Sequence, residues 1–285
     1  MIKINTKIGI LGRSIQYSLS PIIHEYWLKQ NKINGKYEIF DIEEKEIKGF
    51  MQNLVHKNIK GLNVTIPYKN KIIKYLDDVS AASKAIGAVN TIKVKKNGML
   101  YGDNTDAKGF IKNLENAFPN WKKIDSPIVV VGAGGAARAI IYSLINSNKS
   151  EIRIVNRNKK RAHNLIMDIK KIFPYANINF FEEYNNALRD VSFLINTSSL
   201  GMVGYPDLNI DLSEMKRNSI VYDIVYSPLE TNLLNQAKKL DFLTINGLGM
   251  LLEQAAPAFN TWFNKNVKVT KALKEIVIKD IENRQ

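Results

Sequence analysis

The sequence contains no cysteine among its 285 residues. This absence excludes disulfide bonds, zinc–thiolate sites and thiol nucleophiles, and it fits a reducing compartment. The three histidines, His24, His56 and His163, are too scattered along the chain to predict a metal site, so we expect none. His24 follows Ser20 by four residues on an expected helix, and we expect it to have a structural role.

The sequence also lacks a long uninterrupted apolar run. Lysines interrupt the first residues, and no apolar core of a secretory signal follows them. The most apolar stretch, residues 128–145, holds three glycines and Arg138 near its centre, where a charge inside a bilayer costs at least ~2.5 kcal/mol. We therefore expect a buried strand followed by a helix there, no membrane contact and a cytoplasmic location.

Acidic residues are fewer than basic ones, and the net charge is +14. A nucleic-acid-binding protein would gather its basic residues with aromatic ones on one face. Here the 41 lysines and arginines are spread over the whole chain. This distribution favours a solvated surface with some attraction for anionic ligands, such as phosphorylated cofactors and carboxylates, over a nucleic-acid partner.

Apolar stretches of strand length alternate with helical ones. In the first part, we expect strands at residues 7–12, 36–42 and 59–65, helices at 20–30 (with Ser20 as N-cap) and 43–55, a helical stretch from Pro67, and a hairpin turning at Asn97-Gly98. In the second part, we expect a helix from Asp106 to about residue 116, a strand, turn and helix at 127–145, and strands at 151–157, 192–198, 219–225 and 242–247. The segment 269–281 predicts an amphipathic helix with Leu273, Ile276, Val277 and Ile281 on its apolar face.

This alternation predicts an α/β fold with parallel sheets covered by helices on both faces. Two such series predict two domains. Ligands of open α/β sheets bind beyond the carboxyl ends of the strands, and we therefore expect the active site in a cleft between the domains.

A glycine-rich turn follows the apolar strand at residues 128–131. Gly132, Gly134 and Ala137 match the G-x-G-x-x-G/A pattern in its required context of strand, turn and helix. The glycines permit a tight turn and close approach to a pyrophosphate, and the helix N-terminus favours its negative charge. The alternative is a glycine turn with no ligand, but the complete context favours dinucleotide binding.

The next strand distinguishes between the two nicotinamide dinucleotides. An NAD site typically has an acidic residue at the end of this strand. Here the strand ends in Asn156 and Arg157, and Arg161 follows. A guanidinium can pair with a 2′-phosphate through two hydrogen bonds, so we expect NADP as the cofactor, the alternative being a merely basic surface turn.

Polar clusters occur where several expected strands end. They are Ser18 and Ser20, Asn63, Thr65 and Lys69, Asn90 and Thr91, Asn104 and Asp106, Tyr222 and Tyr226, and Gln254. Each cluster alone is a weak signal. Together they provide hydroxyls, amides, an amine and a carboxylate, which suit a small polyhydroxylated substrate.

The motifs "SLSPIIH", "NVTIPYK", "GAVNT", "GDNTDAKGF", "GAGGAARA", "NRNKKRA", "NTSSLGM", "YDIVYSPLET" and "GLGMLLEQAAPAF" occur in this order from Ser18 to Phe259. In this combination the chain resembles shikimate dehydrogenases. The resemblance implies reversible NADPH-dependent reduction of 3-dehydroshikimate to shikimate, a step of chorismate and aromatic amino-acid biosynthesis. It also implies a substrate-binding domain at residues 1–105 and 248–285 and a Rossmann-type NADP domain at 106–247.

The resemblance further assigns roles to individual residues. It implies that Lys69 and Asp106 lie side by side at the substrate, and we expect Lys69 to transfer the proton with Asp106 as its partner. A purely binding role for Lys69 is the alternative. Further substrate contacts are expected from Ser18, Ser20, Thr65, Asn90, Tyr226 and Gln254, and cofactor contacts from Gly132, Ala133, Gly134, Gly135, Ala136, Asn156, Arg157, Arg161, Ile224 and Gly247.

Three rival functions remain open. A quinate/shikimate dehydrogenase with relaxed cofactor use is the nearest, although the basic turn at Arg157 argues against strict use of NAD. A non-catalytic NADPH-binding regulator would need neither Lys69 nor Asp106, and a nucleic-acid-binding protein is suggested only by charge. The sequence does not fix the oligomeric state, and a homodimer is compatible with it.

Overall fold

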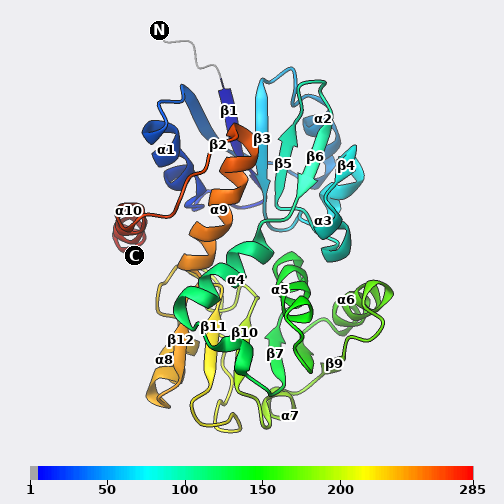
Figure 1. Cartoon of the computed structure of the whole chain (residues 1–285), viewed down its shortest axis with the longest axis vertical. Coiled ribbons are helices and arrows are strands. Elements are labelled where there is room, and N and C mark those ends of the chain that lie inside the picture. The colour runs from blue at the N-terminus through cyan, green and yellow to red at the C-terminus, as the bar shows by residue number, and fades with distance from the viewer. Residues whose placement is uncertain (1–5, 285) are drawn as a thin grey trace. The chain divides into compact units, whose positions relative to one another are not determined.

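The computed structural model describes residues 6–284, and the chain divides into two compact units (Figure 1). Unit 1 comprises the chain up to Thr105 together with Gln254–Glu282, and unit 2 comprises Asp106–Glu253 and the chain from Asn283. The chain returns to unit 1 within helix α9 (Leu248–Phe263). Assignment of the units to substrate and cofactor stays a prediction at this point.

Unit 1 contains a six-stranded sheet in the order β2-β1-β3-β5-β6-β4. The pairs β1–β2 and β1–β3 are parallel, whereas β3–β5 and β5–β6 are antiparallel. Strands β5 and β6 form the expected hairpin around Gly98. The sheet is therefore mixed rather than purely parallel. Its strands are β1 (Thr6–Gly12), β2 (Gly35–Asp41), β3 (Ile59–Val64), β4 (Asp78–Val79), β5 (Thr91–Val94) and β6 (Leu100–Asp103).

The helices of unit 1 differ from the sequence prediction in three places. Helix α1 begins at Ser20 rather than after it, with Leu19 as N-cap, because the amide of Ser20 is bonded to the Ser18 hydroxyl. The expected helix at 43–55 is a short 3₁₀ turn, η1, followed by an α2 that ends at Gln52. The helical stretch expected from Pro67 begins as a turn, and the short 3₁₀ helix η2 follows it. The helical elements are α1 (Ser20–Gln30), η1 (Glu44–Glu46), α2 (Ile47–Gln52), η2 (Lys71–Tyr75), α3 (Ala81–Ile86) and α10 (Lys271–Asn283).

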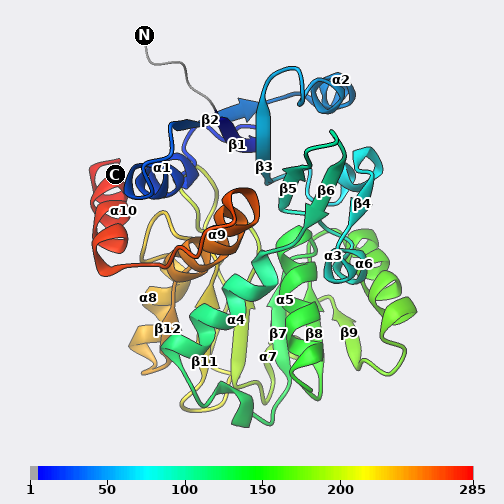
Figure 2. The same ribbon diagram turned by 45° about the horizontal axis from the view of Figure 1, so that its top comes forward.

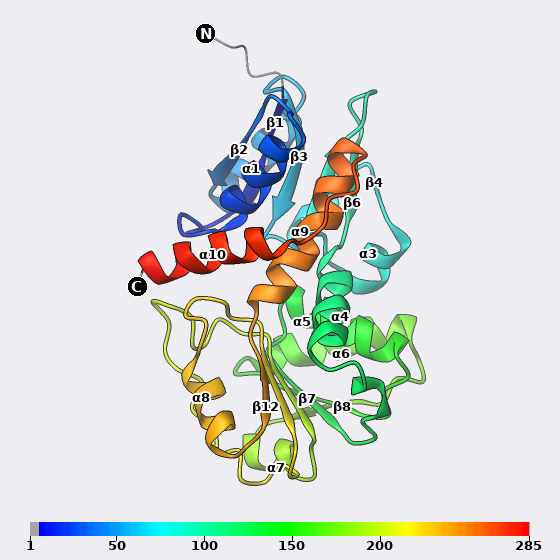
Figure 3. The same ribbon diagram turned by 60° about the vertical axis from the view of Figure 1, so that its left-hand side comes forward.

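The last helix of the chain, α10, lies next to α1, as Figures 2 and 3 both show. The indole of Trp27 donates to the carbonyl of Lys268, and the hydroxyls of Tyr26 and Thr270 are within 3.3 Å. Leu273, Val277 and Ile281 are buried as predicted, but Ile276 is 44% exposed. Ile276 is the residue next to Val277, so a one-residue step around the helix turns it toward solvent.

His24 lies in an aromatic cluster between α1, β2 and α9. It is fully buried, its ring stacks on Tyr37 with centroids 4.6 Å apart, and Trp27, Phe259 and Trp262 surround it. The expected structural role of His24 is thereby confirmed.

Unit 2 contains a fully parallel six-stranded sheet in the order β12-β11-β10-β7-β8-β9. Every residue of β7, β10 and β11 is buried, as expected for central strands covered on both faces. Figure 2 shows helices α4 and α5 on one of these faces. The strands are β7 (Ile128–Val131), β8 (Ile152–Val155), β9 (Ile178–Phe181), β10 (Phe193–Asn196), β11 (Ile220–Asp223) and β12 (Leu243–Ile245).

The doubly wound sheet of unit 2 confirms the Rossmann-type fold expected from the glycine pattern. The short strand β9 was not predicted from the sequence. The helical elements are α4 (Asp106–Ala117), η3 (Trp121–Lys123), α5 (Gly135–Asn146), α6 (Lys159–Ile172), α7 (Tyr184–Leu188) and α8 (Asn232–Lys239). Among residues 6–284, no helix combines the length and the apolar character needed to cross a bilayer.

Candidate functional site

The turn between β7 and α5 forms a backbone cradle at the carboxyl end of the unit 2 sheet. Gly132 has φ +114°, and a Cβ there would lie 2.5 Å from the hydroxyl of Thr197. Gly134 precedes α5 as its N-cap, no side chain caps this helix, and a Cβ on Gly134 would meet no atom within 4 Å. The space above Gly134 and the amides of the first turn of α5 therefore fit an anionic group such as a pyrophosphate.

The remaining glycine-turn residues agree with the pattern. Ala137 is fully buried, so the helix packs closely on the sheet. Thr197 fixes the turn from the neighbouring strand, because its amide and its hydroxyl both donate to the carbonyl of Val131, at 2.8 and 2.6 Å. Ala133, Gly135 and Ala136 lie between these fixed points and are partly exposed.

The end of β8 presents a basic loop to solvent. Asn156 donates to the carbonyl of Asn158 at 2.8 Å, and Asn158 caps α6 by accepting from the amide of Arg161. Arg157 and Arg161 are exposed, and neither forms an ion pair among residues 6–284. Two guanidinium groups are thus available near the glycine cradle, one in the loop after the adjacent strand β8 and one in the first turn of α6.

Beyond β11, the expected cofactor residues Ile224 and Gly247 are in close contact. The amide of Gly247 donates to the carbonyl of Val225 at 2.9 Å, and a Cβ on Gly247 would lie 1.9 Å from the carbonyl oxygen of Ile224. Only glycine fits at this position. Tyr226, an expected substrate residue, follows on the same segment and is half-buried.

In unit 1, two expected substrate residues are joined directly. The amide of Asn90 donates to the side-chain oxygen of Gln254 at 3.2 Å. Thr105 supports both, because its amide and hydroxyl lie 2.8 and 3.2 Å from the Asn90 oxygen and its hydroxyl lies 3.4 Å from that of Gln254. Asn90 and Thr105 are buried, so this cluster is a fixed polar surface that connects β5, β6 and α9.

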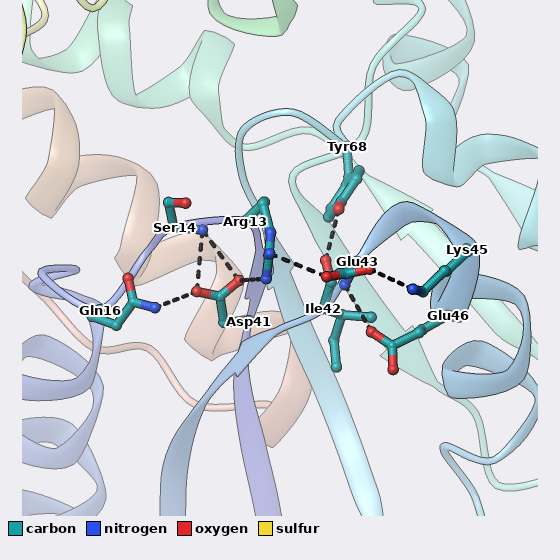
Figure 4. A network of polar contacts seen from close by, with 9 residues as sticks. All are labelled: Arg13, Ser14, Gln16, Asp41, Ile42, Glu43, Lys45, Glu46 and Tyr68. Atoms are coloured by element: carbon teal, nitrogen blue, oxygen red, sulfur yellow. Dashed lines mark hydrogen bonds and ion pairs between the residues drawn. The ribbon is translucent and has the colours of Figure 1, made fainter.

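The loop between β1 and α1 carries Ser18 and is held from outside by Asp41, at the end of β2 (Figure 4). The Asp41 carboxylate accepts from the backbone amide of Ser14 through both oxygens at 3.1 Å. It also accepts from the Arg13 guanidinium at 3.2 Å and from the side-chain amide of Gln16. In the same loop, the Ser18 hydroxyl accepts a hydrogen bond from the backbone amide of Ser20. The two serines expected at the substrate are therefore adjacent.

The segment after β3 carries Thr65 and Lys69, and Pro67 does not begin a helix in it. The Ile66–Pro67 peptide is cis, and the amide of Tyr68 donates to the carbonyl of Thr65, which closes a tight turn. The carbonyls of Ile66 and Lys69 accept from Arg13 and Val89, so neighbouring segments use groups that a helix would have used internally. Lys69 is half-buried on this pinned backbone.

Asp106 is the first residue of α4 and is buried. It directly follows Thr105, whose position is fixed by Asn90. Lys69 belongs to unit 1 and Asp106 to unit 2, and the pairing of these two residues stays a prediction.

Three polar residues of the strand-end clusters are buried and form hydrogen bonds inside the protein. Tyr222 is fully buried against Phe110 and accepts a 2.6 Å hydrogen bond from Asn113, and burial raises its pKa above the ordinary value. Asn63 accepts from Tyr37 at 2.7 Å, and Asn104 donates to the carbonyl of Ala88. A strand-end position alone did not separate these core groups from the others.

Sequence reasoning also missed residues that hold the site. Thr105 and Thr197 lie inside the quoted motifs, so the position of each immediately after an asparagine was the available signal. Asp41 lies in no motif, and its contact with Ser14 spans 27 positions of the chain. Among residues 6–284, no cluster of three or more carboxylate or imidazole side chains suits a metal ion.

Comparison with protein families gives two matches. Residues 10–92 match a family described as shikimate dehydrogenase substrate binding domain, and residues 114–227 match one described as shikimate / quinate 5-dehydrogenase. A relative from Methylocella silvestris, named shikimate dehydrogenase (NADP(+)), is 40% identical, with 96% of each chain covered.

Solved structures agree with these matches. A shikimate 5-dehydrogenase from Thermus thermophilus, in complex with NADP(H) and shikimate, superposes with a TM-score of 0.82 at 28% identity, covering 97% of this chain and 99% of that one. A quinate dehydrogenase from Corynebacterium glutamicum, in complex with NAD, superposes with a TM-score of 0.87 at 26% identity, covering 96% and 99%.

Proposed function

The chain belongs to the shikimate dehydrogenase family, and from this premise we propose that it catalyses the reversible NADPH-dependent reduction of 3-dehydroshikimate to shikimate. It is then an oxidoreductase that acts on a CH–OH group. Its two partners are small molecules, a polyhydroxylated cyclic acid and a dinucleotide. In this assignment unit 1 binds the substrate and unit 2 binds NADP.

The observation that carries the proposal is the cradle between β7 and α5. Its uncapped helix N-terminus, the left-handed Gly132 and the open space above Gly134 suit a pyrophosphate. When bound, NADP supplies the chemistry of hydride donor and acceptor. The turn residues from Gly132 to Ala136 would hold its pyrophosphate through their backbone.

The choice of NADP over NAD is supported by the end of β8. The end of β8 and the loop residues 156–158 carry no carboxylate of their own, and Arg157 and Arg161 are exposed with no ion pair among the described residues. Their guanidinium groups, with the amide of Asn156, would bind that phosphate. The relative from Methylocella silvestris carries NADP(+) in its name.

For the substrate, Ser18, Ser20 and Thr65 offer hydroxyl groups, and Asn90 and Gln254 offer amides on a fixed surface. Tyr226 would contribute from the segment after β11. These groups are suited to a ring with several hydroxyls and one carboxylate.

Proton transfer at the C3 oxygen of the substrate is the remaining requirement of the reaction. In reduction, we assign Lys69 to donate a proton to this oxygen while hydride reaches C3, and in oxidation to receive it back. Asp106 would stabilise the ammonium form of Lys69 and accept from a substrate hydroxyl. The half-buried lysine and the buried carboxylate are compatible with these roles.

A spectroscopic assay tests the proposal directly. Purified protein is supplied with shikimate or quinate, each with NADP⁺ or NAD⁺, and formation of the reduced nicotinamide is followed by its absorbance. We expect the highest kcat/KM with shikimate and NADP⁺. A preference for quinate or NAD⁺ would instead indicate an activity like that of the relative from Corynebacterium glutamicum. If no combination gave reduced cofactor, the assignment would be refuted.

A further inference from the structure

Asp223 is a buried carboxylate that none of the expected site roles uses. It ends β11, is fully buried, and forms no ion pair with another described residue. Burial raises its pKa to about 6, and the hydrogen bonds it accepts oppose this rise. A buried acid without a cation is costly to keep, and such groups gather at functional sites.

The Asp223 carboxylate accepts hydrogen bonds from both ends of one loop. One oxygen accepts from the amide of Val225 at 3.0 Å, and the other accepts from the hydroxyl of Thr231 at 2.8 Å. The residues between Val225 and Thr231 include Tyr226, and Ile224 directly precedes Val225. A single side chain therefore closes this loop at its base.

Asn196, at the end of β10, supports the same carboxylate from the neighbouring strand. Its amide donates to Asp223 at 2.9 Å and to the carbonyl of Leu200 at 3.1 Å, and its side-chain oxygen accepts from the amide and hydroxyl of Ser198. Its backbone carbonyl accepts from the amide of Ile224. Asn196 thus ties the loops after β10 and β11 to each other.

Gly247 closes the segment from the opposite side. Its amide bonds to Val225, and its missing Cβ leaves the space that the carbonyl of Ile224 occupies. The amide of Val203 also donates to the carbonyl of Ser227 at 3.0 Å. Ile224 and Val225 are therefore held between the Asp223 carboxylate and the Gly247 backbone, with little freedom to move.

The strand order indicates which part of the cofactor this segment meets. In the sheet, β8 lies on one side of β7 and β10 and β11 lie on the other. A dinucleotide whose pyrophosphate rests on the β7 turn and whose 2′-phosphate lies at β8 must extend its nicotinamide half toward β10 and β11.

We propose that Asp223 is a positioning residue that, together with Asn196, fixes the segment Ile224–Tyr226 so that the nicotinamide is held in the geometry needed for hydride transfer. This inference rests on the proposed function. It separates two tasks in unit 2: the loop after β8 sets affinity, and the Asp223 network sets the orientation of the reacting ring. A misplacement of about 1 Å at a reacting centre can lower the rate about 100-fold.

The decisive variant is Asp223→Asn, which keeps the shape and one acceptor oxygen but not the second. Ser219→Ala is its matched control, because Ser219 is equally buried and hydrogen-bonded at the other end of the same strand. We expect Asp223→Asn to lower kcat about 10-fold to 100-fold and to change the affinity for adenosine 2′,5′-bisphosphate less than about twofold. The control should keep the wild-type values.

The fluorescence of bound NADPH provides a readout that does not depend on turnover. Immobilisation of the reduced nicotinamide enhances its emission, and we expect Asp223→Asn to bind NADPH with a smaller enhancement than wild type. If wild type oxidises no shikimate, the proposed function fails, while the fluorescence comparison still decides the positioning role.

Thr231 provides a second pair of variants if Asp223→Asn does not fold. Thr231→Val removes the donor to Asp223, and Thr231→Ser restores it. We expect the loss of kcat and of fluorescence enhancement in the first and recovery of both in the second. Wild-type kcat and fluorescence in a folded Asp223→Asn or Thr231→Val variant would overturn the inference, as would an equal loss of affinity for NADPH and the adenosine fragment.

Discussion

The side-chain oxygen of Asn90 accepts hydrogen bonds from both the backbone amide and the hydroxyl of Thr105, at 2.8 and 3.2 Å. The two residues are buried and belong to different motifs, one directly before β5 and the other two residues after the end of β6. Through this contact an expected substrate residue is fixed by the residue that immediately precedes Asp106. The positions of the two substrate amides, Asn90 and Gln254, therefore depend on one threonine.

Replacing Thr105 with valine should weaken substrate binding. The variant keeps the shape of the side chain but leaves Asn90 and Gln254 without its hydroxyl, and a buried group without a partner costs about 1–3 kcal/mol. We expect the KM for shikimate to rise about 5-fold or more, with the KM for NADP⁺ unchanged. Steady-state kinetics would measure this, and Thr105→Ser should restore the wild-type KM. An unchanged KM in Thr105→Val would contradict the role.

Replacing Lys69 with alanine tests its assignment as the proton donor. A positioned general acid contributes about 10²-fold to 10⁴-fold, so kcat should fall by that order while the KM for shikimate changes far less. The control is Lys71→Ala, two positions along the chain, where the lysine forms a surface ion pair with Glu44 and kcat should stay at the wild-type value. Near-normal kcat in Lys69→Ala would leave the lysine a binding role only.

Several elements of unit 2, though not β9, could be predicted because the local sequence of each one specifies it. An apolar run, two glycines and a second apolar run specify β7, the turn and α5 without reference to the rest of the chain. Pro67 misled for the opposite reason. A proline at this place favours the start of a helix. However, the backbone amides of Arg13 and Val89 donate to the carbonyls near Pro67, and such long-range hydrogen bonds cannot be recognised from the local sequence.

Within the motifs, too, the role of a residue could be predicted where it depends on local structure and not where it depends on distant contacts. Gly132 and Gly247 are required by backbone approach, which their residue type already indicates. Tyr222 and Tyr226 lie four residues apart in one motif, yet the first is in the core and the second is half-buried on the following loop. Only the end of β11 at Asp223 separates them, and strand ends are predicted to within a few residues at best.

The basic loop after β8 predicts the cofactor preference. Changing both Arg157 and Arg161 to alanine removes the two guanidinium groups available to a 2′-phosphate, and charge-assisted hydrogen bonds contribute about 1.5–3 kcal/mol each. We expect kcat/KM with NADP⁺ to fall at least about 10-fold, while kcat/KM with NAD⁺ stays constant. The control for net charge changes both Lys170 and Lys171, in the last turn of α6, to alanine and so removes the same number of charges. A parallel fall with both cofactors would contradict a 2′-phosphate contact.

The contacts of Asp41 with the loop between β1 and α1, which carries Ser18, lead to a different kinetic prediction. Asp41→Asn leaves one acceptor oxygen, so the bonds from Ser14, Arg13 and Gln16 cannot all persist. We expect the loop to loosen and the KM for shikimate to rise about 3-fold to 10-fold, with the dissociation constant of NADPH unchanged. Glu38→Gln, on the same strand with only weak surface ion pairs, should leave both constants alone. A kcat loss without a KM change would place Asp41 elsewhere in the mechanism.

The aromatic cluster around His24 predicts how stability depends on pH. Burial lowers the pKa of His24 from 6.5 to about 3, and a weaker hydrogen-bonding influence of Asn63 opposes this. Below pH 6.5 the unfolded chain therefore binds a proton at His24, whereas the folded protein does not. The free energy of unfolding falls as the pH is lowered from about 6.5 to about 3, by up to ~1.4 kcal/mol per pH unit.

The variant His24→Phe tests this pH dependence, because it keeps an aromatic ring that cannot titrate. Denaturant unfolding at pH 7 and pH 5 should show a smaller loss for this variant than for wild type, by about 2 kcal/mol. Asp223 titrates in both proteins and cancels in the difference. Identical losses in the two proteins would mean that His24 is protonated in the folded state.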